Sequence, residues 1–404
     1  MRVKITPSTA KGEIVAPPSK SMAHRLLISA ALCDGKSIVR GISACEDVLA
    51  TLDCLDALGI KTEKEGDDVV VYGRDVFSLT PTKNLHCRES GSTLRFFIPI
   101  ALVSGKTVMF SGEGGLMKRP LSVYEEICKE KNLVFLQDGN TVTVRGPITP
   151  DNYTVVGNIS SQFISGLLFA LPMLDGDSRI NILPPLESRS YIDMTINALS
   201  CFGVKVIWEN DHTLFIKGNQ RYVPTEVTVE GDYSGAAFPD ALNLLGSEVK
   251  VLGLLPDSLQ GDRVYKKYFE QLSSGVPTIH IGDCPDLGPI LFAVAAAKCG
   301  GIFSGTRRLK IKESDRAKAM AEELSKFGTS VSVLEDKVVV YPAKFHKPTV
   351  PLSGHNDHRI VMSLAILLTL FGGEIEGAEA VSKSYPEFFS HLSSLGIGVV
   401  EYET

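Results

Sequence analysis

The chain has 404 residues and a net charge of −6, with 44% hydrophobic and 22% charged residues. This length exceeds what one hydrophobic core usually serves, so we expect two domains of an ordinary globular protein. The acidic balance argues against a nucleic-acid binder, whose affinity depends on a basic excess, and any anion site must therefore be local.

The cysteines and the apolar segments indicate the compartment. Eight cysteines are scattered without a C-x-x-C pair or a neighbouring His at metal-ligand spacing, so we expect free thiols and no metal. The first five residues lack the apolar core of a signal peptide. The longest apolar stretch, residues 360–371, is too short to span a bilayer. We therefore expect a cytoplasmic protein that does not bind membranes.

The first functional candidate in chain order is the segment 17–25, Pro-Pro-Ser-Lys-Ser-Met-Ala-His-Arg, which an apolar run follows. The prolines end an extended segment and the serines favour a helix start, where free N–H groups and the helix dipole attract an anion. Ser21 and Arg25 lie four residues apart, on one helical face, and can converge on a carboxylate or phosphate. An ordinary capped helix with solvated cations is the alternative.

A supersecondary pattern then recurs along the chain. An apolar helix ends at a small residue, a short strand follows, and a polar turn leads to a second strand. The helices end near positions 59, 132, 203, 275, 328 and 396, and the polar turns lie at 66–68, 138–140, 210–212 and 335–336. The copy at 268–280 is weaker, and the copy that begins at 391 is truncated by the end of the chain. Such a period indicates an array of similar units.

Six copies divide naturally into two sets of three. The segment 223–232, which contains a proline and a glycine, is the best candidate for the crossing between the sets. Because each copy joins an apolar helix to a hairpin, each set can bury its helices inside and carry its sheets outside. A generic α/β protein with ordinary hairpins is the alternative.

Further helix starts share the chemistry of the first. Hydroxyl groups, glycine and cations gather at 89–95, 160–162, 312–316, 356–359 and 382–386. Each cluster can be explained as an ordinary helix cap. Cations at helix N-termini are disfavoured by the dipole, however, and their repetition therefore indicates a ligand with several anionic groups.

Eight motifs, in this order, resemble the EPSP synthase family of enolpyruvyl transferases over nearly the whole chain. They are Ser19-Lys20-Ser21-x-x-x-Arg25, Ser90-Gly91-Ser92-x-x-Arg95, Lys118-Arg119-Pro120, Ser160-Ser161-Gln162, Ser188-x-x-Tyr191-Ile192-Asp193, Lys312-Glu313-Ser314-Asp315-Arg316, Asn356-Asp357-His358-Arg359 and Ser382-Lys383-Ser384-Tyr385-Pro386. One such motif is a weak signal, whereas eight in register are specific.

The resemblance implies an α/β (α+β) fold of two similar domains. Each domain is expected to contain three βαβ-type repeats with helices inside and sheets outside, an inside-out α/β barrel. Residues 17–228 would form the N-terminal domain, on the shikimate 3-phosphate side. Residues 1–16 plus 229–404 would form the C-terminal domain, on the phosphoenolpyruvate side, because in the family the N-terminal strand joins the second domain. The active site is expected in the cleft between the domains.

The resemblance also implies a reaction of the shikimate pathway to chorismate and aromatic amino acids. The enolpyruvyl (carboxyvinyl) group of phosphoenolpyruvate moves to the 5-hydroxyl of shikimate 3-phosphate by addition and elimination, and phosphate leaves. By position, the residues expected at shikimate 3-phosphate are Lys20, Ser21, Arg25, Ser160, Ser161, Gln162, Ser188, Tyr191, Asp286 and Lys312. Those expected at phosphoenolpyruvate are Lys20, Gly91, Arg119, Gln162, Arg316, Arg359 and Lys383, with Ser92, Arg95 and His358 as additional contacts.

Three residues receive catalytic roles from the resemblance. Asp286 is expected to act as the base toward the 5-hydroxyl, Glu313 as the acid toward the methylene carbon, and Lys20 as an aid to phosphate departure. Without the resemblance, Asp286 would be interpreted as a turn residue. No metal or organic cofactor is implied, since the cations can stabilise the developing charge. We expect a monomer whose partners are the two small substrates.

Two positions depart from the family pattern. Glu89 stands where many relatives carry Asn, which brings a carboxylate near an anion pocket unless Arg88 or another cation pairs with it. The segment 306–310 lacks an Asn that some relatives use for a shikimate hydroxyl. Affinity for phosphoenolpyruvate and its mimics is therefore left open, as is one shikimate contact.

Three alternatives to this function are kept. A related enzyme transfers enolpyruvate to a UDP-sugar, but it typically has Lys-Asn in place of Lys20-Ser21 and often a reactive cysteine within the segment that corresponds to 112–120, where this chain has none. An RNA-end-binding protein of similar architecture would need interleaved basic and aromatic residues. A noncatalytic sugar-phosphate sensor would need the anion sites but not Asp286 and Glu313.

Overall fold

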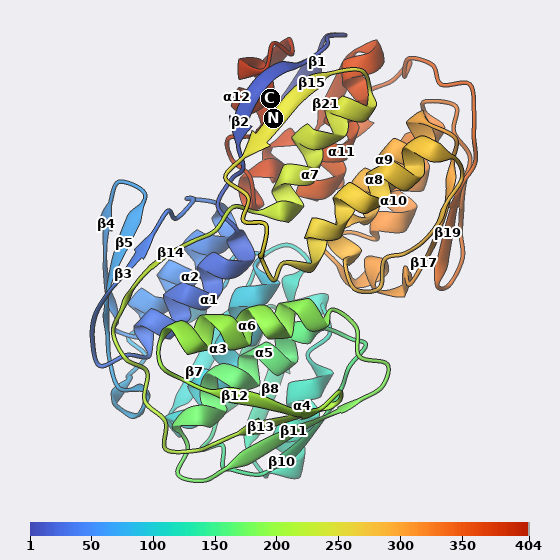
Figure 1. The fold of residues 1–404 in the computed structure, drawn as a ribbon. Helices are drawn as coiled ribbons and strands as arrows, with labels where there is room; N and C mark the ends of the chain where they lie inside the picture. Colours follow the sequence, from blue (N-terminus) through green and yellow to red (C-terminus); the bar gives the residue numbers. More distant parts are fainter. Residues whose placement is uncertain (403–404) are drawn as a thin grey trace. The chain divides into compact units, whose positions relative to one another are not determined.

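The structure, a computed structural model, describes residues 1–402. The chain divides into two compact units, which Figure 1 draws as ribbons. We call Lys20–Glu230 the N-terminal unit, and Met1–Ser19 together with Gly231–Thr404 the C-terminal unit. Both points of division lie a few residues after those expected from the sequence. Among residues 1–402, no helix has the length and the apolar character needed to cross a membrane.

Helices and three sheets make up the N-terminal unit. The helices are α1 (Lys20–Ala31), α2 (Glu46–Ala57), α3 (Gly91–Val103), α4 (Ser122–Glu130), α5 (Ser161–Ala170) and α6 (Arg189–Cys201), with short 3-10 helices η1 (Val76–Ser78), η2 (Leu116–Lys118) and η3 (Leu171–Met173). The strands are β3 (Gly35–Arg40), β4 (Lys61–Glu65), β5 (Asp68–Gly73), β6 (Leu85–His86), β7 (Thr107–Ser111), β8 (Val134–Asp138), β9 (Thr141–Arg145), β10 (Asn152–Val156), β11 (Ser178–Leu183), β12 (Val206–Asn210), β13 (Thr213–Ile216) and β14 (Glu226–Thr228). The sheet orders are β14-β3-β5-β4, β6-β7-β9-β8 and β10-β11-β13-β12.

Each of these sheets combines a parallel pair with an antiparallel hairpin. In the second sheet, β6 and β7 are parallel and α3 connects them, while β8 and β9 form the hairpin. The third sheet repeats this arrangement with β10, α5 and β11. Gly66 and Gly139 turn two of the hairpins at φ angles of +66° and +53°, where other residues would be strained. The predicted hairpins and βαβ-type repeats of this unit are confirmed.

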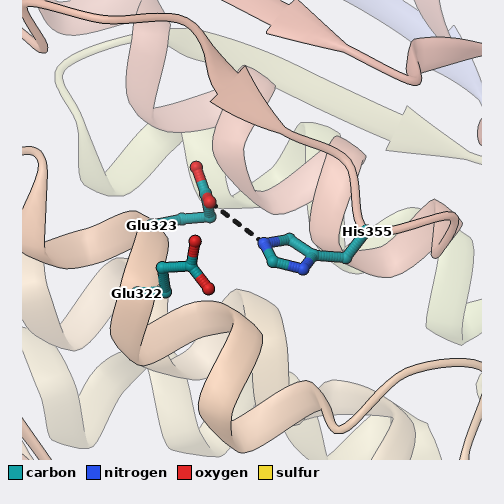
Figure 2. Close-up of side chains that lie close together, drawn as sticks. All are labelled: Glu322, Glu323 and His355. Atoms are coloured by element: carbon teal, nitrogen blue, oxygen red, sulfur yellow. Dashed lines mark hydrogen bonds and ion pairs between the residues drawn. The ribbon is translucent and has the colours of Figure 1, made fainter.

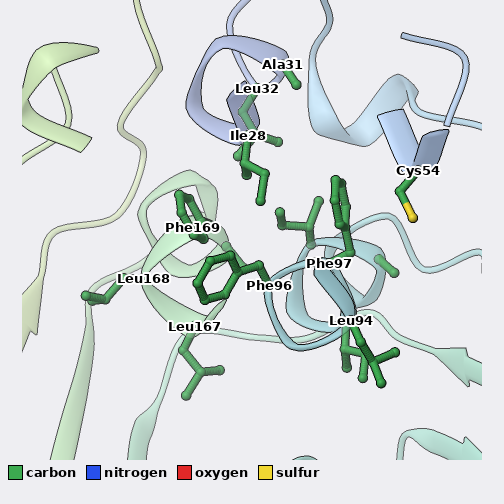
Figure 3. Close-up of a cluster of buried hydrophobic side chains, with 14 of the residues drawn as sticks. Ile28, Ala31, Leu32, Cys54, Leu94, Phe96, Phe97, Leu167, Leu168 and Phe169 are labelled. Atoms are coloured by element: carbon green, nitrogen blue, oxygen red, sulfur yellow. The ribbon is translucent and has the colours of Figure 1, made fainter. Parts of the chain in front are cut away.

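Helices form the centre of the N-terminal unit. Almost every residue of α3 and α5 is buried, including Phe96 and Phe169, whose rings lie 5.4 Å apart. Figure 3 shows Ile28 of α1 and Phe96 of α3 beside Phe169 of α5. The strands instead alternate between buried and exposed residues, so each sheet covers the helices on one face. The expected placement of helices inside and sheets outside is confirmed.

The C-terminal unit has the same design. Its helices are α7 (Tyr233–Leu244), α8 (Tyr265–Ser274), α9 (Gly288–Ala297), α10 (Arg316–Ser325), α11 (His358–Phe371) and α12 (Phe388–Ser394), with η4 (Gly261–Val264), η5 (Pro285–Leu287), η6 (Arg307–Ile311) and η7 (Ala378–Lys383). Its strands are β1 (Arg2–Ile5), β2 (Lys11–Val15), β15 (Glu248–Leu252), β16 (Thr278–His280), β17 (Gly301–Ser304), β18 (Val331–Val333), β19 (Lys337–Val340), β20 (Leu352–Ser353), β21 (Gly373–Glu376) and β22 (Val399–Tyr402). The sheet orders are β15-β2, β16-β17-β19-β18 and β20-β21-β1-β22.

Two details of this unit differ from the repeat pattern read from the sequence. The weaker copy at 268–280 has no hairpin of its own, because β16 pairs in parallel with β17 of the next copy. The final copy is not left incomplete, because β1 lies between β21 and β22 and pairs with both. The N-terminal strands therefore belong to the C-terminal unit, as the family resemblance implied.

Candidate active site

The start of α1 presents Lys20 as the first helical residue of the N-terminal unit. Its ammonium lies 2.7 Å from a carboxylate oxygen of Asp47 in the first turn of α2, and both side chains are mostly buried. A cation at a helix start is opposed by the dipole, and the neighbouring carboxylate offsets that cost. Sequence reasoning missed Asp47, whose only signal was an acidic residue in a helix start, the most ordinary place for one.

Arg25 lies one turn further along α1 and is almost completely buried. Its guanidinium donates to the Thr195 hydroxyl at 2.8 Å and to the backbone oxygens of Ser21 and Tyr191 at 2.6 and 3.1 Å. The Tyr191 ring lies 5.9 Å from the guanidinium carbon. Burial lowers the pKa of Arg25 to about 10. The structure thus brings together three of the predicted residues, from α1 and α6, around a rigidly held cation.

The starts of α3 and α5 meet through Gln162. Its amide donates to the Ser92 hydroxyl at 2.9 Å, and its carbonyl oxygen accepts from Arg95 at 2.7 Å. Arg119 lies against Gly91, since a Cβ added at Gly91 would come within 2.8 Å of the guanidinium. Glycine at the first residue of α3 is therefore what allows this cation to approach the helix start.

The three predicted phosphate-binding serines lie at the starts of two helices. Ser160 is the N-cap of α5, and its hydroxyl accepts from the backbone N–H of Gln162 at 3.3 Å. Ser161 is the first helical residue. Ser188 precedes α6 in the left-handed conformation, with a φ of +58°. Helix starts with hydroxyl groups suit phosphate oxygens, so these serines remain candidates for binding phosphate.

In the C-terminal unit, Asp286 of η5 lies among three cations. Its carboxylate is 2.8 Å from the guanidinium of Arg316, 3.0 Å from that of Arg359 and 3.2 Å from the ammonium of Lys312. These cations come from the start of α10, the start of α11 and the end of η6. A group that the sequence alone would interpret as a turn residue is therefore the centre of a charge cluster.

Arg316 is the most buried member of that cluster, with 1% of its side chain exposed. It also contacts Glu313 at 2.7 Å and Asp357 at 2.8 Å. The three carboxylates raise the pKa of Arg316 against the opposing effect of burial. Burial dominates at Lys312 and lowers the pKa of its amine to about 8, although Asp286 acts in the opposite direction. The two catalytic candidates, Asp286 and Glu313, thus share one cation.

The last two predicted residues of this unit lie close to α11. His358 is the first residue of that helix and is buried. The Lys383 ammonium donates to the backbone oxygen of Asn356 at 2.7 Å, just before the helix. The expectation that the segment 382–386 opens the last helix is wrong, because Lys383 ends η7 and α12 begins only at Phe388. Lys383 is therefore positioned by a backbone contact rather than at a helix start.

Glu323 organises a separate group of charges, of which Figure 2 shows Glu322, Glu323 and His355. Its fully buried carboxylate accepts from Lys326 at 2.9 Å, from the Ser353 amide at 2.9 Å and from His355 at 3.0 Å. Glu322 completes a cluster with metal-ligand spacing. The carboxylate oxygens of Glu323 already have cationic and N–H donors, so we infer that these contacts stabilise the loop that leads to α11.

The sequence suggested Arg88 as an ion-pair partner for Glu89, but Arg88 pairs with other carboxylates. The Arg88 guanidinium pairs with Asp53 at 2.8 Å and with Glu46. The Glu89 carboxylate instead lies against Gly114, where an added Cβ would come within 2.7 Å. The departure at Glu89 therefore brings a carboxylate to the loop that carries Arg119.

Comparison with known proteins identifies the family. The description EPSP synthase (3-phosphoshikimate 1-carboxyvinyltransferase) belongs to a family model that matches residues 5–392. This chain belongs to the EPSP synthase family. A relative from Clostridium kluyveri named 3-phosphoshikimate 1-carboxyvinyltransferase is 39% identical, with 99% of this chain and 98% of the relative covered. One of the same name from Clostridium novyi is 41% identical at the same coverage.

Solved structures carry the same fold as this member of the EPSP synthase family. An EPSP synthase from Acinetobacter baumannii aligns with a TM-score of 0.79 over 99% of this chain and 100% of that chain, at 23% sequence identity. The likeness confirms the predicted α/β fold of two similar domains.

Proposed function

We infer that this chain is a 3-phosphoshikimate 1-carboxyvinyltransferase of the shikimate pathway. It transfers the carboxyvinyl group of phosphoenolpyruvate to the 5-hydroxyl of shikimate 3-phosphate and releases phosphate. The full-length relatives at 39% to 41% identity carry this name. The observation that supports the chemistry best is the contact of Asp286 with Lys312, Arg316 and Arg359, because it combines a candidate base with cations suited to an anionic donor.

The cations of the C-terminal unit are proposed to bind phosphoenolpyruvate. Without substrate, Arg316 and Arg359 balance their charge on Asp286. The carboxylate and phosphate of phosphoenolpyruvate would compete for the same guanidinium groups, for which bidentate pairing with such anions is favourable. Asp286 would then lose part of its pairing and accept the proton of the 5-hydroxyl. Donor binding would in this way prepare the base.

Glu313 and Lys20 are proposed to handle the other proton and the leaving group. The addition step needs a proton at the methylene carbon, and Glu313, which contacts Arg316 at 2.7 Å, would deliver it. Elimination then removes a proton from the methyl group and expels phosphate. The Lys20 ammonium would stabilise the charge that develops on the departing phosphate, a role that suits a compact point charge.

The N-terminal unit is proposed to bind shikimate 3-phosphate. Ser160, Ser161 and Ser188 would accept the phosphate at two helix starts, while Arg25 and Tyr191 would hold the carboxylate and the ring. Gln162, which contacts both Ser92 and Arg95, would orient the substrate between these groups. Because the acceptor and donor must meet for the transfer, we propose that both units act on one pair of substrates.

The decisive experiment measures phosphate release from phosphoenolpyruvate with shikimate 3-phosphate or with a UDP-sugar as the acceptor. Turnover with shikimate 3-phosphate alone is expected. Turnover with the UDP-sugar alone would favour the related transferase, and turnover with neither would favour a noncatalytic binding protein. Lys20→Met and Asp286→Ala are each expected to reduce kcat at least about a hundredfold, the scale of a lost acid–base group. Near-native activity in either variant would reject its assigned role.

Two further properties belong to the proposal. We expect the enzyme to work as a cytoplasmic monomer without a metal or an organic cofactor, with phosphoenolpyruvate and shikimate 3-phosphate as its partners. Activity that survives a strong chelator would support the metal-free mechanism. Loss of activity with chelator, and its recovery on adding back a divalent cation, would contradict it.

A further inference from the structure

A chain of buried hydrogen bonds joins the first three helices of the N-terminal unit. The Nδ1 atom of His24 in α1 lies 2.7 Å from the hydroxyl of Thr51 in α2. The Thr51 hydroxyl in turn lies 2.8 Å from the hydroxyl of Thr93 in α3, and the Thr93 hydroxyl donates to that of Ser90 at 2.8 Å. All four residues are fully buried. The three helices are therefore connected by polar contacts as well as by the apolar core.

These contacts determine where each hydrogen of the chain points. The single hydroxyl hydrogen of Thr93 is directed at the Ser90 oxygen and, at 3.4 Å, at the backbone oxygen of Asp47. The Thr51 hydroxyl must therefore donate to Thr93, and the Nδ1 atom of His24 must carry the hydrogen that Thr51 accepts. The Nε2 atom of His24 has no hydrogen-bond partner among residues 1–402, as expected for a ring nitrogen without a hydrogen. Thr51 thus acts as an acceptor and a donor at once.

The chain lies one helical turn behind the ion pair of Lys20 and Asp47. His24 follows Lys20 by one turn of α1, and Thr51 follows Asp47 by one turn of α2. The ion pair and the His24–Thr51 hydrogen bond are therefore successive connections between the same two helices. Burial, and next the two neighbouring cations of α1, hold the pKa of His24 well below its usual value, so its ring is neutral and adds no charge beside Lys20.

We propose that Thr51 is a positioning residue for the transfer reaction: its hydroxyl fixes the starts of α1 and α3 on α2, and thereby the distance between Lys20 and Gly91. This role rests on the proposed function, since phosphoenolpyruvate is expected at both of these groups. Ser90, at the end of the chain, is the N-cap of α3 and directly precedes Gly91. Loss of the Thr51 hydroxyl would leave one donor and one acceptor buried without a partner, and a shift of the helices would relieve this cost.

Thr51→Val and Thr51→Ser separate the hydroxyl from the packing. Valine keeps the volume and loses the hydroxyl, whereas serine keeps the hydroxyl and loses a methyl group. Because a misplacement of about 1 Å can cost up to about a hundredfold in rate, we expect Thr51→Val to lower kcat/KM for phosphoenolpyruvate about tenfold. Thr51→Ser is expected to keep at least about half of the wild-type value. A residue that only filled space would give the reverse order, because a lost buried methyl group leaves a cavity.

The two substrates should respond differently to Thr51→Val. Most candidate groups for shikimate 3-phosphate lie on α5, on α6 and on Arg25, which Thr195 holds. The KM for shikimate 3-phosphate is therefore expected to change less than about twofold. Ser29→Ala is the matched control, because Ser29 is buried in α1 and its hydroxyl has no hydrogen-bond partner within residues 1–402. This control is expected to keep both kinetic constants within about twofold of wild type.

The position of the His24 hydrogen tests the chain independently of activity. Nitrogen NMR of the histidine rings distinguishes a hydrogen on Nδ1 from one on Nε2, and His24→Gln identifies the signal. In the wild type at about pH 7 we expect a neutral ring with its hydrogen on Nδ1, and in Thr51→Val a shifted signal. A charged ring, or a hydrogen on Nε2 in the wild type, would overturn the direction of the chain and with it the role of Thr51.

The outcomes separate the two levels of inference. An active wild type with unchanged kinetics in Thr51→Val would overturn the positioning role alone. Equal losses in Thr51→Val and Thr51→Ser would also overturn it, since they would indicate general damage to packing. If Thr51→Val does not fold, Thr51→Ser and the His24 signal decide: a tenfold loss with serine, or a hydrogen on Nε2, would overturn the role. A wild type inactive with phosphoenolpyruvate and shikimate 3-phosphate would overturn the proposed function and this inference with it.

Discussion

Gly166 in the middle of α5 is the position where a single methyl group should harm the N-terminal unit most clearly. In an exposed helix, Gly→Ala stabilises by about 1 kcal/mol. At Gly166, the added Cβ would come within 2.2 Å of the Tyr124 hydroxyl and within 2.4 Å of the Arg95 backbone oxygen. The Tyr124 hydroxyl donates to that same oxygen at 2.7 Å, so the clash and the hydrogen bond cannot coexist.

The expected loss of stability combines three contributions. Overpacking between α3 and α5 costs about 1–3 kcal/mol, and the loss of the buried Tyr124 hydrogen bond costs about 1–3 kcal/mol. After subtraction of the helix gain of about 1 kcal/mol, Gly166→Ala should destabilise the unit by about 3 kcal/mol. With a urea m-value of about 3 kcal/mol/M for a unit of this size, the midpoint should fall by about 1 M.

Trp208 makes the measurement specific. It is the single tryptophan of the chain and lies in β12, so its fluorescence in urea follows the N-terminal unit. Gly115→Ala is the control, because a Cβ there meets nothing within 4 Å, and it should change stability by less than about 0.5 kcal/mol. Tyr124→Phe should cost less in the Gly166→Ala background than in wild type, since it removes the clashing atom. A Gly166→Ala midpoint at or above that of wild type would refute the packing of α3 against α5 described above.

Three further predictions follow from individual contacts. Because burial lowers the pKa of Lys312 to about 8, its charge is present below that pH and is lost as pH rises through it, so kcat/KM should fall on the alkaline side near pH 8. In Lys312→Arg the guanidinium stays charged, and a pH profile with the same alkaline limb in both proteins would exclude Lys312 as its source. Glu323→Gln should destabilise the C-terminal unit by about 2 kcal/mol in calorimetry, because it breaks the buried contacts with Lys326 and His355, whereas exposed Glu322→Gln should stay within about 0.5 kcal/mol. Equal melting curves for these two variants would contradict the inference that Glu323 stabilises the loop before α11. Asp47→Asn removes the charge 2.7 Å from the Lys20 ammonium and should lower kcat about tenfold, which steady-state phosphate release at saturating substrates measures. A kcat equal to that of wild type would show that Lys20 acts without this partner.

The parts of the fold that could be predicted are those encoded locally. The hairpins around Gly66 and Gly139 follow from a turn residue between two alternating strands, and both are found. The pairing of β1 with β21 and β22 has no such local signal, because it joins residues at opposite ends of the chain. It was expected only through the family resemblance. The misread copy at 268–280 has the same cause, since pairing with β17 rather than a turn decides its strand.

In the candidate site, the sequence indicates which residues belong to it but not which residues hold them in place. The motifs predicted which hydroxyl groups and cations lie at helix starts, because the signals for a helix start are recognisable along the sequence. They could not predict what holds each group. Arg25 is fixed by Thr195, 170 positions away along the chain, and Lys20 by Asp47 from another helix. The Ser234 hydroxyl, which accepts from Arg359 at 2.6 Å, belongs to no motif.

The distribution of charge explains why buried cations can be kept ready for anionic substrates. An isolated buried cation would be strongly destabilising, so a buried cation needs hydrogen-bond acceptors or carboxylates within the protein while the substrate is absent. Arg316 has three such partners, Asp286, Glu313 and Asp357, but only Asp357 is itself fully buried. Asp357 can therefore remain paired permanently, while the partly accessible Asp286 and Glu313 are the ones that an incoming anion can displace. On this reasoning we expect Asp286 and Glu313 to act as the acid–base groups, because they are the partners of Arg316 that a substrate can replace while Asp357 still balances its charge.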